Sequence, residues 1–407
     1  MRGLGSGFAR LWTARAISQL GDGVTLVAGP LLAAALTRDP VLVAGLAFAA
    51  RLPFLLFSLP GGALVDRLDR RRLMVVADAL RAVAMAGLAV AVAFDAAGLP
   101  VLYAVFFVIG VGETLFDTAS HSILPALVRP EQLEVANSRL SGAQIIAEEL
   151  AGPPLGGLLF AAAAALPLAL DAGTFGLAAL LIAFLPGSFR PHIPPGQVRA
   201  SLRADIAEGV AWLARQPLLR TLTLAIGLMN LTLSAAMSVM VLVAQERLGL
   251  GPVGYGVLLA SMAVGGIVAS LVGERVIARL GPATALRGGL VIETSTHVVI
   301  ALATSPFVVA AALAAFGFHA VVWTVVTTSL RQQLVPDRLL GRVMSASLLF
   351  GAGGLSLGAL LGGALAAAFG LTAPFWVSAA SVALMTAVAW RSLGPAAVSA
   401  ARDVARA

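Results

Sequence analysis

Hydrophobic positions in this chain form long uninterrupted runs, separated by charged residues, prolines and glycines. A helix needs about 20 apolar residues to cross the hydrocarbon core of a bilayer. Twelve runs reach this length, at approximately residues 11–36, 41–65, 73–94, 99–121, 138–162, 167–186, 218–245, 252–274, 284–304, 306–330, 343–369 and 372–391. The pattern predicts an all-α integral membrane protein with twelve transmembrane helices.

The longest break between runs divides the predicted helices into two groups of six. We expect an N-terminal six-helix half at 1–186, a cytoplasmic linker at 187–217, a C-terminal six-helix half at 218–393 and a cytoplasmic tail at 394–407. The linker contains an amphipathic stretch, Ser201–Arg215, whose apolar residues at helical spacing predict a surface helix. Two local matches at an offset of 206 residues, Pro130 with Pro336 and Leu155 with Leu361, favour two pseudo-repeats, although helices rich in alanine, glycine and leucine also match by chance.

Arginine placement predicts the orientation of the chain in the membrane. Of 27 basic residues, all arginine, 22 lie in the termini and in alternate loops, whereas the opposite loops carry only Arg38 and Arg247. Because cytoplasmic loops accumulate basic residues, both termini are expected in the cytoplasm of a cell with a bacterial-type inner membrane.

Composition excludes several other classes of protein. Hydrophobic residues make up 59% of the chain and charged residues 12%, about half the charged share of a soluble domain. Without cysteine there is no disulfide or thiolate metal site, and four scattered histidines do not predict a metal centre. Without lysine there is no phosphate-binding loop, and no catalytic constellation is apparent, so we expect neither an enzyme nor a cofactor. The net charge of +7 is spread over separate loops, which argues against nucleic-acid binding.

The most specific motif is Gly61-Gly-Ala-Leu-Val-Asp-Arg-Leu-Asp-Arg-Arg-Arg72, at the cytoplasmic end of the second run. It resembles the loop between the second and third helices of the major facilitator superfamily, with Asp69 in place of the usual glycine. Ile17-Ser-Gln-Leu-Gly-Asp22 and Val335-Pro-Asp-Arg-Leu-Leu-Gly-Arg-Val-Met-Ser345 narrow the resemblance to the third drug:proton antiporter branch, which includes macrolide efflux proteins and the enterobactin exporter.

This resemblance implies a secondary transporter that works by alternating access. It implies export of a lipophilic drug, a macrolide-like compound or a siderophore, coupled to inward proton movement. A facilitator or importer of a small metabolite is the alternative, which the sparse polar content of the runs disfavours. A membrane sensor or scaffold is a further rival, but the short loops leave no room for a folded soluble domain. The expected partners are a small-molecule substrate, protons and the lipid bilayer, and a monomer would suffice.

In the family, the loop after the second helix latches the cytoplasmic side in the outward-open state. The resemblance therefore assigns a cytoplasmic latch, with a role as a simple topology anchor as the alternative. Gly62 is expected to allow close helix approach. The latch residues are Gly62, Asp66, Arg67, Arg70, Arg71, Asp117 and Arg342.

The fifth run contains a glycine-proline segment that resembles an antiporter motif of the superfamily. Glycines allow two helices to close together and prolines bend a helix, so we interpret the segment as a hinge or a tight seal, with ordinary small-residue packing as the alternative. Its residues are Gly152, Pro153, Pro154, Gly156 and Gly157.

Charged residues within spans are costly and are candidate functional groups. A carboxyl group that alternates between wet and dry surroundings can load and release a proton, so Asp22, Glu113 and Glu148 are the proton-coupling candidates. A static ion pair between Asp22 and Arg51 is an equally favoured interpretation of Asp22. Glu293 ranks lower, because the ninth helix is peripheral in the superfamily. The fourth span lacks the intramembrane arginine of many proton antiporters, which puts that form of coupling in doubt.

The second half offers residues for an adaptable apolar cavity, because methionine and aromatic side chains repack around bulky ligands. For any one of them, helix packing is the favoured alternative, and His297 and His319 are expected to be hydrogen-bonded core residues rather than proton carriers. The cavity candidates are Met229, Asn230, Phe316, His319 and Trp323.

Overall fold

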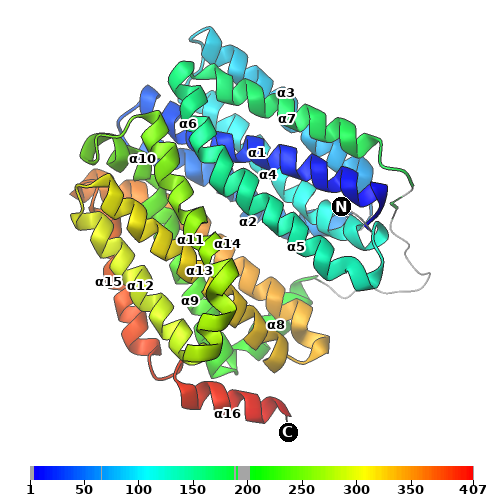
Figure 1. Cartoon of the computed structure of the whole chain (residues 1–407), viewed down its shortest axis with the longest axis vertical. Helices are drawn as coiled ribbons and strands as arrows, with labels where there is room; N and C mark the ends of the chain where they lie inside the picture. The colour runs from blue at the N-terminus through cyan, green and yellow to red at the C-terminus, as the bar shows by residue number, and fades with distance from the viewer. Residues whose placement is uncertain (1–3, 66, 188, 191–201, 407) are drawn as a thin grey trace. The chain divides into compact units, whose positions relative to one another are not determined.

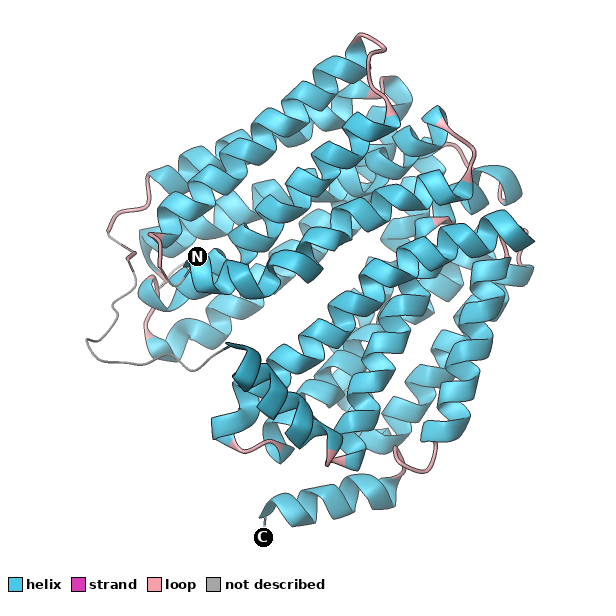
Figure 2. Ribbon diagram, turned by 180° about the vertical axis from the view of Figure 1, so that it is seen from behind, coloured by secondary structure: helices cyan, strands magenta, loops and turns pink. Residues whose placement is uncertain are grey.

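The computed structural model describes residues 4–65, 67–187, 189–190 and 202–406. These residues form helices joined by short loops, and no strand occurs among them (Figure 2). The all-α prediction is confirmed.

The first six spans account for the helices of the N-terminal part of the chain. They comprise α1 (Gly5–Leu36), α2 (Pro40–Val65), α3 (Arg70–Ala93), α4 (Leu99–Ile123), the 3₁₀ turns η1 (Leu124–Ala126) and η2 (Pro130–Gln132), α5 (Leu133–Gln144), the π-helix η3 (Ile145–Ala151), α6 (Gly152–Ala162) and α7 (Ala165–Ala183). The fifth span is therefore a composite of α5, η3 and α6, in which a π-helical segment directly precedes the glycine-proline residues.

The remaining helices begin at Leu202, within the predicted linker. They are α8 (Leu202–Ala214), α9 (Pro217–Ser238), α10 (Met240–Leu242), the π-helix η4 (Val243–Arg247), α11 (Pro252–Leu280), α12 (Pro282–Leu302), α13 (Pro306–Leu334), α14 (Asp337–Phe369), α15 (Ala373–Ala389) and α16 (Pro395–Arg406). α8 covers the part of the amphipathic stretch from Leu202 to Ala214, and it buries Leu213.

Eleven helices in the described chain are long and apolar enough to cross a bilayer, and α15 is a shorter apolar helix of 17 residues. At 1.5 Å per residue α15 spans about 26 Å, close to the hydrocarbon thickness. Several helices extend beyond the predicted runs at their arginine-rich ends: α11 continues to Leu280 and α14 begins at Asp337. Hydropathy detects only the apolar part of a helix, whereas backbone hydrogen bonding continues into polar sequence.

The sequence marks many of the helix ends. Pro217, Pro252 and Pro306 each stand at the first position of a helix, where the missing N–H costs no hydrogen bond. Gly281 and Gly370 follow α11 and α14 with φ of 78° and 91°, a left-handed conformation that ends a helix at little cost for glycine. These signals explain why the loops between spans are so short.

The chain forms two compact units. Unit 1 comprises Met1–Pro194 and Ala244–Ala260, and unit 2 comprises Pro195–Val243 and Ser261–Ala407. Within unit 1, α7 lies beside both α1 and α3 (Figure 1), and α2 packs on α4. Within unit 2, α9 packs on α14 and α15, and α12 packs on α13 and α15. The segment Ala244–Ala260 contains the end of the seventh span and the start of the eighth, and it packs as part of unit 1.

Two arginines fasten the end of α7 within unit 1. Arg10 donates to the Phe184 carbonyl at 2.6 Å, and Arg71 donates to the Leu185 carbonyl at 2.7 Å. The last carbonyls of a helix lack intrahelical partners and carry negative partial charge, so guanidinium groups stabilise them. Asp69 caps the N-terminus of α3 by accepting a hydrogen bond from the Arg72 N–H at 3.1 Å.

Candidate functional site

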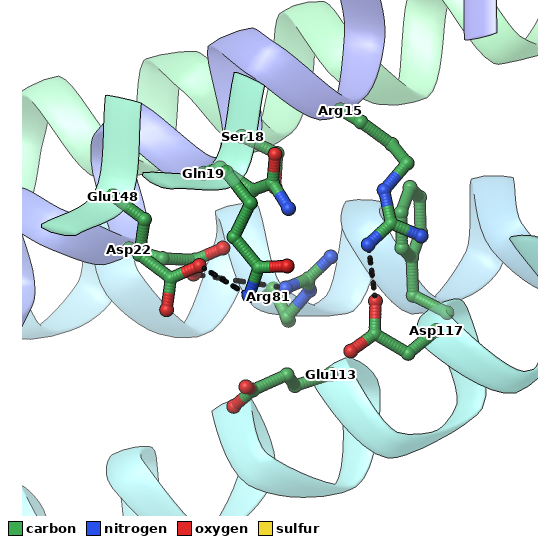
Figure 3. A pocket seen from close by; sticks show the side chains of 10 residues that line it. Arg15, Ser18, Gln19, Asp22, Arg81, Glu113, Asp117 and Glu148 are labelled. Carbon is green, nitrogen blue, oxygen red and sulfur yellow. Dashed lines mark hydrogen bonds and ion pairs between the residues drawn. The ribbon is translucent and has the colours of Figure 1, made fainter. Parts of the chain in front are cut away.

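A polar pocket inside unit 1 is built on one face of α1. Arg15, Ser18, Gln19 and Asp22 follow one another at helical spacing and all line it. The other walls come from α3, α4 and the fifth span. Figure 3 shows the charged side chains of these helices gathered around the same pocket; its further lining residues are Arg81, Glu113, Phe116, Asp117, Gln144 and Glu148.

Arg81 of α3 is the central cation of this site. Its side chain is only 1% exposed, and a guanidinium nitrogen lies 3.8 Å from Asp22 Oδ1. On its other side Arg81 donates a hydrogen bond to Asp78, one helical turn earlier and completely buried. The guanidinium also stacks on Phe175 of α7, 4.2 Å from the ring centroid. Ion pairing and cation–π contacts together compensate for burying this charge.

Two glutamates approach the pocket from other helices. Glu113 comes from α4, and Glu148 comes from η3, where Gln144 Nε2 donates to its Oε2 at 3.1 Å. Glu149, the next residue, is exposed. Of these two adjacent glutamates, Glu148 lines the pocket.

A further acid lies beside this pocket. Asp171 of α7 is fully buried and accepts hydrogen bonds from Thr25 at 2.6 Å and from Thr174 at 3.1 Å. A Cβ placed on Gly21 would collide with Asp171 and Thr174, so glycine at that position lets α1 approach α7 closely.

Acidic groups outnumber cations in this region. Arg15 and Asp117 neutralise each other at 3.1 Å, and Arg15 also donates to Ser120 at 2.7 Å. Five carboxyl groups remain, and they lie around the buried guanidinium of Arg81 and within reach of the charge of the exposed Arg51: Asp22, Asp78, Glu113, Glu148 and Asp171. Two cations cannot neutralise five ionised carboxylates, and the excess negative charge would be strongly unfavourable in a dry interior. The site is therefore suited to binding protons.

The expected partner of Asp22 requires correction. Arg81, rather than Arg51, is the cation beside Asp22. Arg51 is an exposed residue of α2, and its charge acts on Glu113 and Glu148. The physical reason is helix rotation: the positions of the two arginines along their spans do not reveal which one points toward α1.

Comparison with known proteins assigns the fold and the family. Residues 5–405 match the family described as transmembrane secretion effector, a group of major facilitator transporters. The chain belongs to this family. The protein is accordingly a multi-pass membrane transporter.

Curated relatives of this transporter are named as exporters. The multidrug efflux pump Tap of Mycobacterium tuberculosis is 31% identical over 392 residues, covering 91% of this chain and 90% of Tap. The enterobactin exporter EntS of Salmonella typhi is 26% identical, covering 75% of this chain and 73% of EntS. Both names agree with the branch that the motifs indicated.

Solved structures support the major facilitator fold. The nucleoside transporter NupG superposes with a TM-score of 0.72 at 11% identity, covering 96% of this transporter and 99% of NupG. A bacterial homologue of the iron transporter ferroportin gives a TM-score of 0.75 at 18% identity, covering 95% and 98%. At these identities the likeness concerns the fold alone.

The predicted latch residues have partners within their own units. Asp117 forms an ion pair with Arg15 at 3.1 Å. Arg342 forms an ion pair with Glu208 of α8. A Cβ on Gly62 would meet no described atom within 4 Å, so close helix approach does not explain this glycine. Asp66 lies outside the described residues. Arg67 and Arg70 flank the turn between α2 and α3, where Arg67 N–H donates to Leu64 O and Arg70 N–H donates to Phe189 O.

The glycine-proline segment meets two other backbones. A Cβ on Gly152 would lie 2.6 Å from the Cα of Gly23, and one on Gly156 would lie 3.0 Å from the Cα of Val24. A Cβ on Gly157 would press on the backbone of Pro252, and one on Gly256 would press on that of Pro153 and Pro154. The fifth span therefore packs tightly against α1 and the start of α11 within unit 1. This close packing is compatible both with a seal and with ordinary small-residue packing.

The cavity candidates of the second half are mostly packed side chains. Met229, Phe316, His319 and Trp323 are between 2% and 6% exposed, and Met229 and Trp323 belong to the hydrophobic core of unit 2. Asn230 is half-buried and donates to the Gly351 carbonyl at 3.2 Å. For the four buried residues the structure favours the packing alternative over a cavity lining.

Sequence reasoning missed the central role of α3. Neither Arg81 nor Asp78 is among the candidate residues that the sequence analysis names. The spacing of these two residues could have indicated their ion pair, because an acid and an arginine three residues apart lie side by side on an apolar helix.

Proposed function

We propose that this protein exports a lipophilic drug, a macrolide-like compound or a siderophore by proton antiport with alternating access. The excess of carboxyl groups around Arg81 is the observation that carries the proposal, because such a site binds protons when it is shielded and releases them when water enters. The names of the relatives support efflux as the direction of transport.

Asp22 is the principal proton carrier in this proposal, with Glu113 and Glu148 as neighbouring acceptors. At 3.8 Å from Arg81, an ionised Asp22 attracts the guanidinium, and its protonation removes that attraction. Arg81 then remains bound to Asp78 alone. Proton and substrate thereby favour different arrangements of the same helices, which couples their movements.

Accumulation assays in efflux-deficient bacteria test this function. Cells expressing wild type, Asp22→Asn or Asp95→Asn would receive fluorescent dyes, macrolides and catecholate siderophores, with and without a protonophore. Asp95 is the matched control, since it lies exposed in the loop after α3 with φ of 53°, a conformation that asparagine also adopts readily.

We expect wild type and Asp95→Asn to lower the accumulation of at least one compound, and the protonophore to abolish this effect. Asp22→Asn should accumulate the compound like cells without the transporter while reaching the membrane in normal amounts. Higher accumulation in wild type would point to import instead. Full activity of Asp22→Asn would remove Asp22 from the coupling mechanism.

A further inference from the structure

A second group of ionisable side chains is buried in unit 2, whereas the site around Arg81 belongs to unit 1. Glu293 and His297 lie one turn apart on α12, and His319 faces them from α13. Their exposures are 0%, 2% and 2%. His319 Nε2 is 3.5 Å from Glu293 Oε2. Among the described residues, no three acidic or histidine side chains are grouped so as to hold a metal ion.

The neighbours of this group are polar but uncharged. From α9, the Thr232 hydroxyl lies 3.5 Å from Glu293 Oε1, although it is also 3.0 Å from two carbonyls of its own helix. From α15, Ser378 donates to the Thr232 carbonyl. The Phe316 ring meets His319 edge-on, with centroids 4.9 Å apart. None of these groups titrates.

α12 and α13 each carry an arginine, but one is bound to another residue and the other is distant from His319. Arg287, on α12, donates to the Trp390 carbonyl and stacks on its ring at 4.5 Å. Arg331, on α13, is twelve residues beyond His319, about 18 Å along the helix. The start of α16 lies beside Arg287, near Gly394. The charged partner that the structure gives Glu293 is therefore His319, when its imidazole is protonated.

Charge balance then fixes how many protons the group holds. With no proton, a carboxylate remains buried among neutral groups, and with two, a net positive charge is buried there; both states are costly. With one proton the group is neutral, either as a carboxylic acid beside a neutral imidazole or as a carboxylate beside an imidazolium. Glu293 Oε2 and both ring nitrogens of His297 and of His319 lack hydrogen-bond partners, so a proton between Glu293 and His319 would satisfy atoms that are otherwise unpaired.

We propose that Glu293 and His319, with His297 adjoining, form a second proton-binding site, located in unit 2. It binds one proton in the closed, dry packing between α12 and α13, and it exchanges this proton when water reaches it during the transport cycle. The exchange step rests on the proposed antiport function; the binding of a proton does not.

Infrared spectroscopy of the purified protein in lipid tests the binding step directly. A protonated glutamic acid has a C=O stretching band separate from that of a carboxylate. The spectra to compare are those of wild type, Glu293→Gln, Glu293→Asp and His319→Gln, with Glu274→Gln as control. Glu274 is an exposed glutamate of the same unit.

A proton on Glu293 predicts a carboxylic-acid band that disappears in Glu293→Gln and shifts in Glu293→Asp. A proton on His319 predicts instead a new carboxylic-acid band in His319→Gln, because the remaining carboxyl group must then carry the proton itself. Glu274→Gln should match wild type. The proposal is overturned if the carboxylic-acid bands are the same as in wild type in all three variants: Glu293→Gln, Glu293→Asp and His319→Gln.

Transport in proteoliposomes tests the exchange step. An imposed pH gradient should stimulate transport by wild type and Glu274→Gln. In Glu293→Gln and His319→Gln the stimulation should be roughly 10-fold smaller. Substrate binding without a gradient should persist in these variants. Unchanged stimulation in folded Glu293→Gln would refute the exchange while leaving export by way of Asp22 intact. Absence of export in wild type would refute the proposed function. The infrared result would still show whether Glu293 and His319 bind a proton.

Discussion

Arg81 shows how one buried side chain organises its surroundings. Three kinds of contact converge on its guanidinium: an ion pair with Asp22, a hydrogen bond to Asp78, and stacking on Phe175 with Phe116 at 5.1 Å on another side. A planar, delocalised cation can make all of these contacts at once, whereas a lysine ammonium cannot. The residue links α1, α3, α4 and α7 through a single side chain.

Arg81→Met should destabilise the protein by about 3–5 kcal/mol, because it leaves the buried Asp78 without its partner. The double variant Asp78→Asn, Arg81→Met should recover much of this loss, since the fully buried side chain at position 78 then carries no charge. Arg38→Met is the matched control: Arg38 pairs with Glu246 at 3.9 Å with both side chains about half exposed, and such pairs contribute about 0–1 kcal/mol.

Thermal unfolding of the purified variants in detergent would measure these differences. Equal stability of Arg81→Met and Arg38→Met would show that the contacts of Arg81 do not hold the helices together.

At the scale of elements, the packing of the fifth span depends on the absence of side chains. Gly23 on α1 and Gly152 at the start of α6 meet backbone to backbone, and Gly156 follows one turn later against Val24. Membrane helices gain little from the hydrophobic effect between one another, so close van der Waals packing at small residues takes its place. The π-helix η3 lies directly before this crossing and carries Glu148.

Gly152→Ala should destabilise the protein by about 1–3 kcal/mol, because the new methyl group has no space between two backbones. Gly142→Ala on α5 is the control, since a Cβ there would meet no described atom within 4 Å. It should be neutral or stabilising by about 0.5–1 kcal/mol through the better helix propensity of alanine. Thermal unfolding would compare the two, and a larger loss in Gly142→Ala would contradict the packing described here.

At the scale of the whole molecule, the arginine asymmetry predicts which ends of the helices face the cytoplasm. The absence of native cysteine makes single-cysteine labelling a direct test. Ala96, in the loop between α3 and α4, and Ala214, at the end of α8, are both exposed. A membrane-impermeant maleimide should label Ala96→Cys in intact spheroplasts and Ala214→Cys only in inside-out vesicles. The reverse pattern would invert the predicted topology.

The membrane class, the positions of the spans and the family motifs follow from the sequence. Each of these depends on residues that are close together in the chain: a hydropathy sum over one helix length, a proline at the first turn, or a contiguous loop motif. Asp22, Glu113 and Glu148 were also recognisable, because a charge within an apolar span stands out in one dimension.

Partnership between charges was decided by the tertiary structure. Arg81 rather than Arg51 lies beside Asp22, and Asp117 forms an ion pair with Arg15. Glu293 lies against His319, although the sequence had given Glu293 a lower rank as a functional candidate. Each contact depends on how far a helix is rotated about its axis and on which helix packs beside it. Uniformly apolar helices with weak amphipathic character leave that rotation undetermined, so only the packed structure could reveal it.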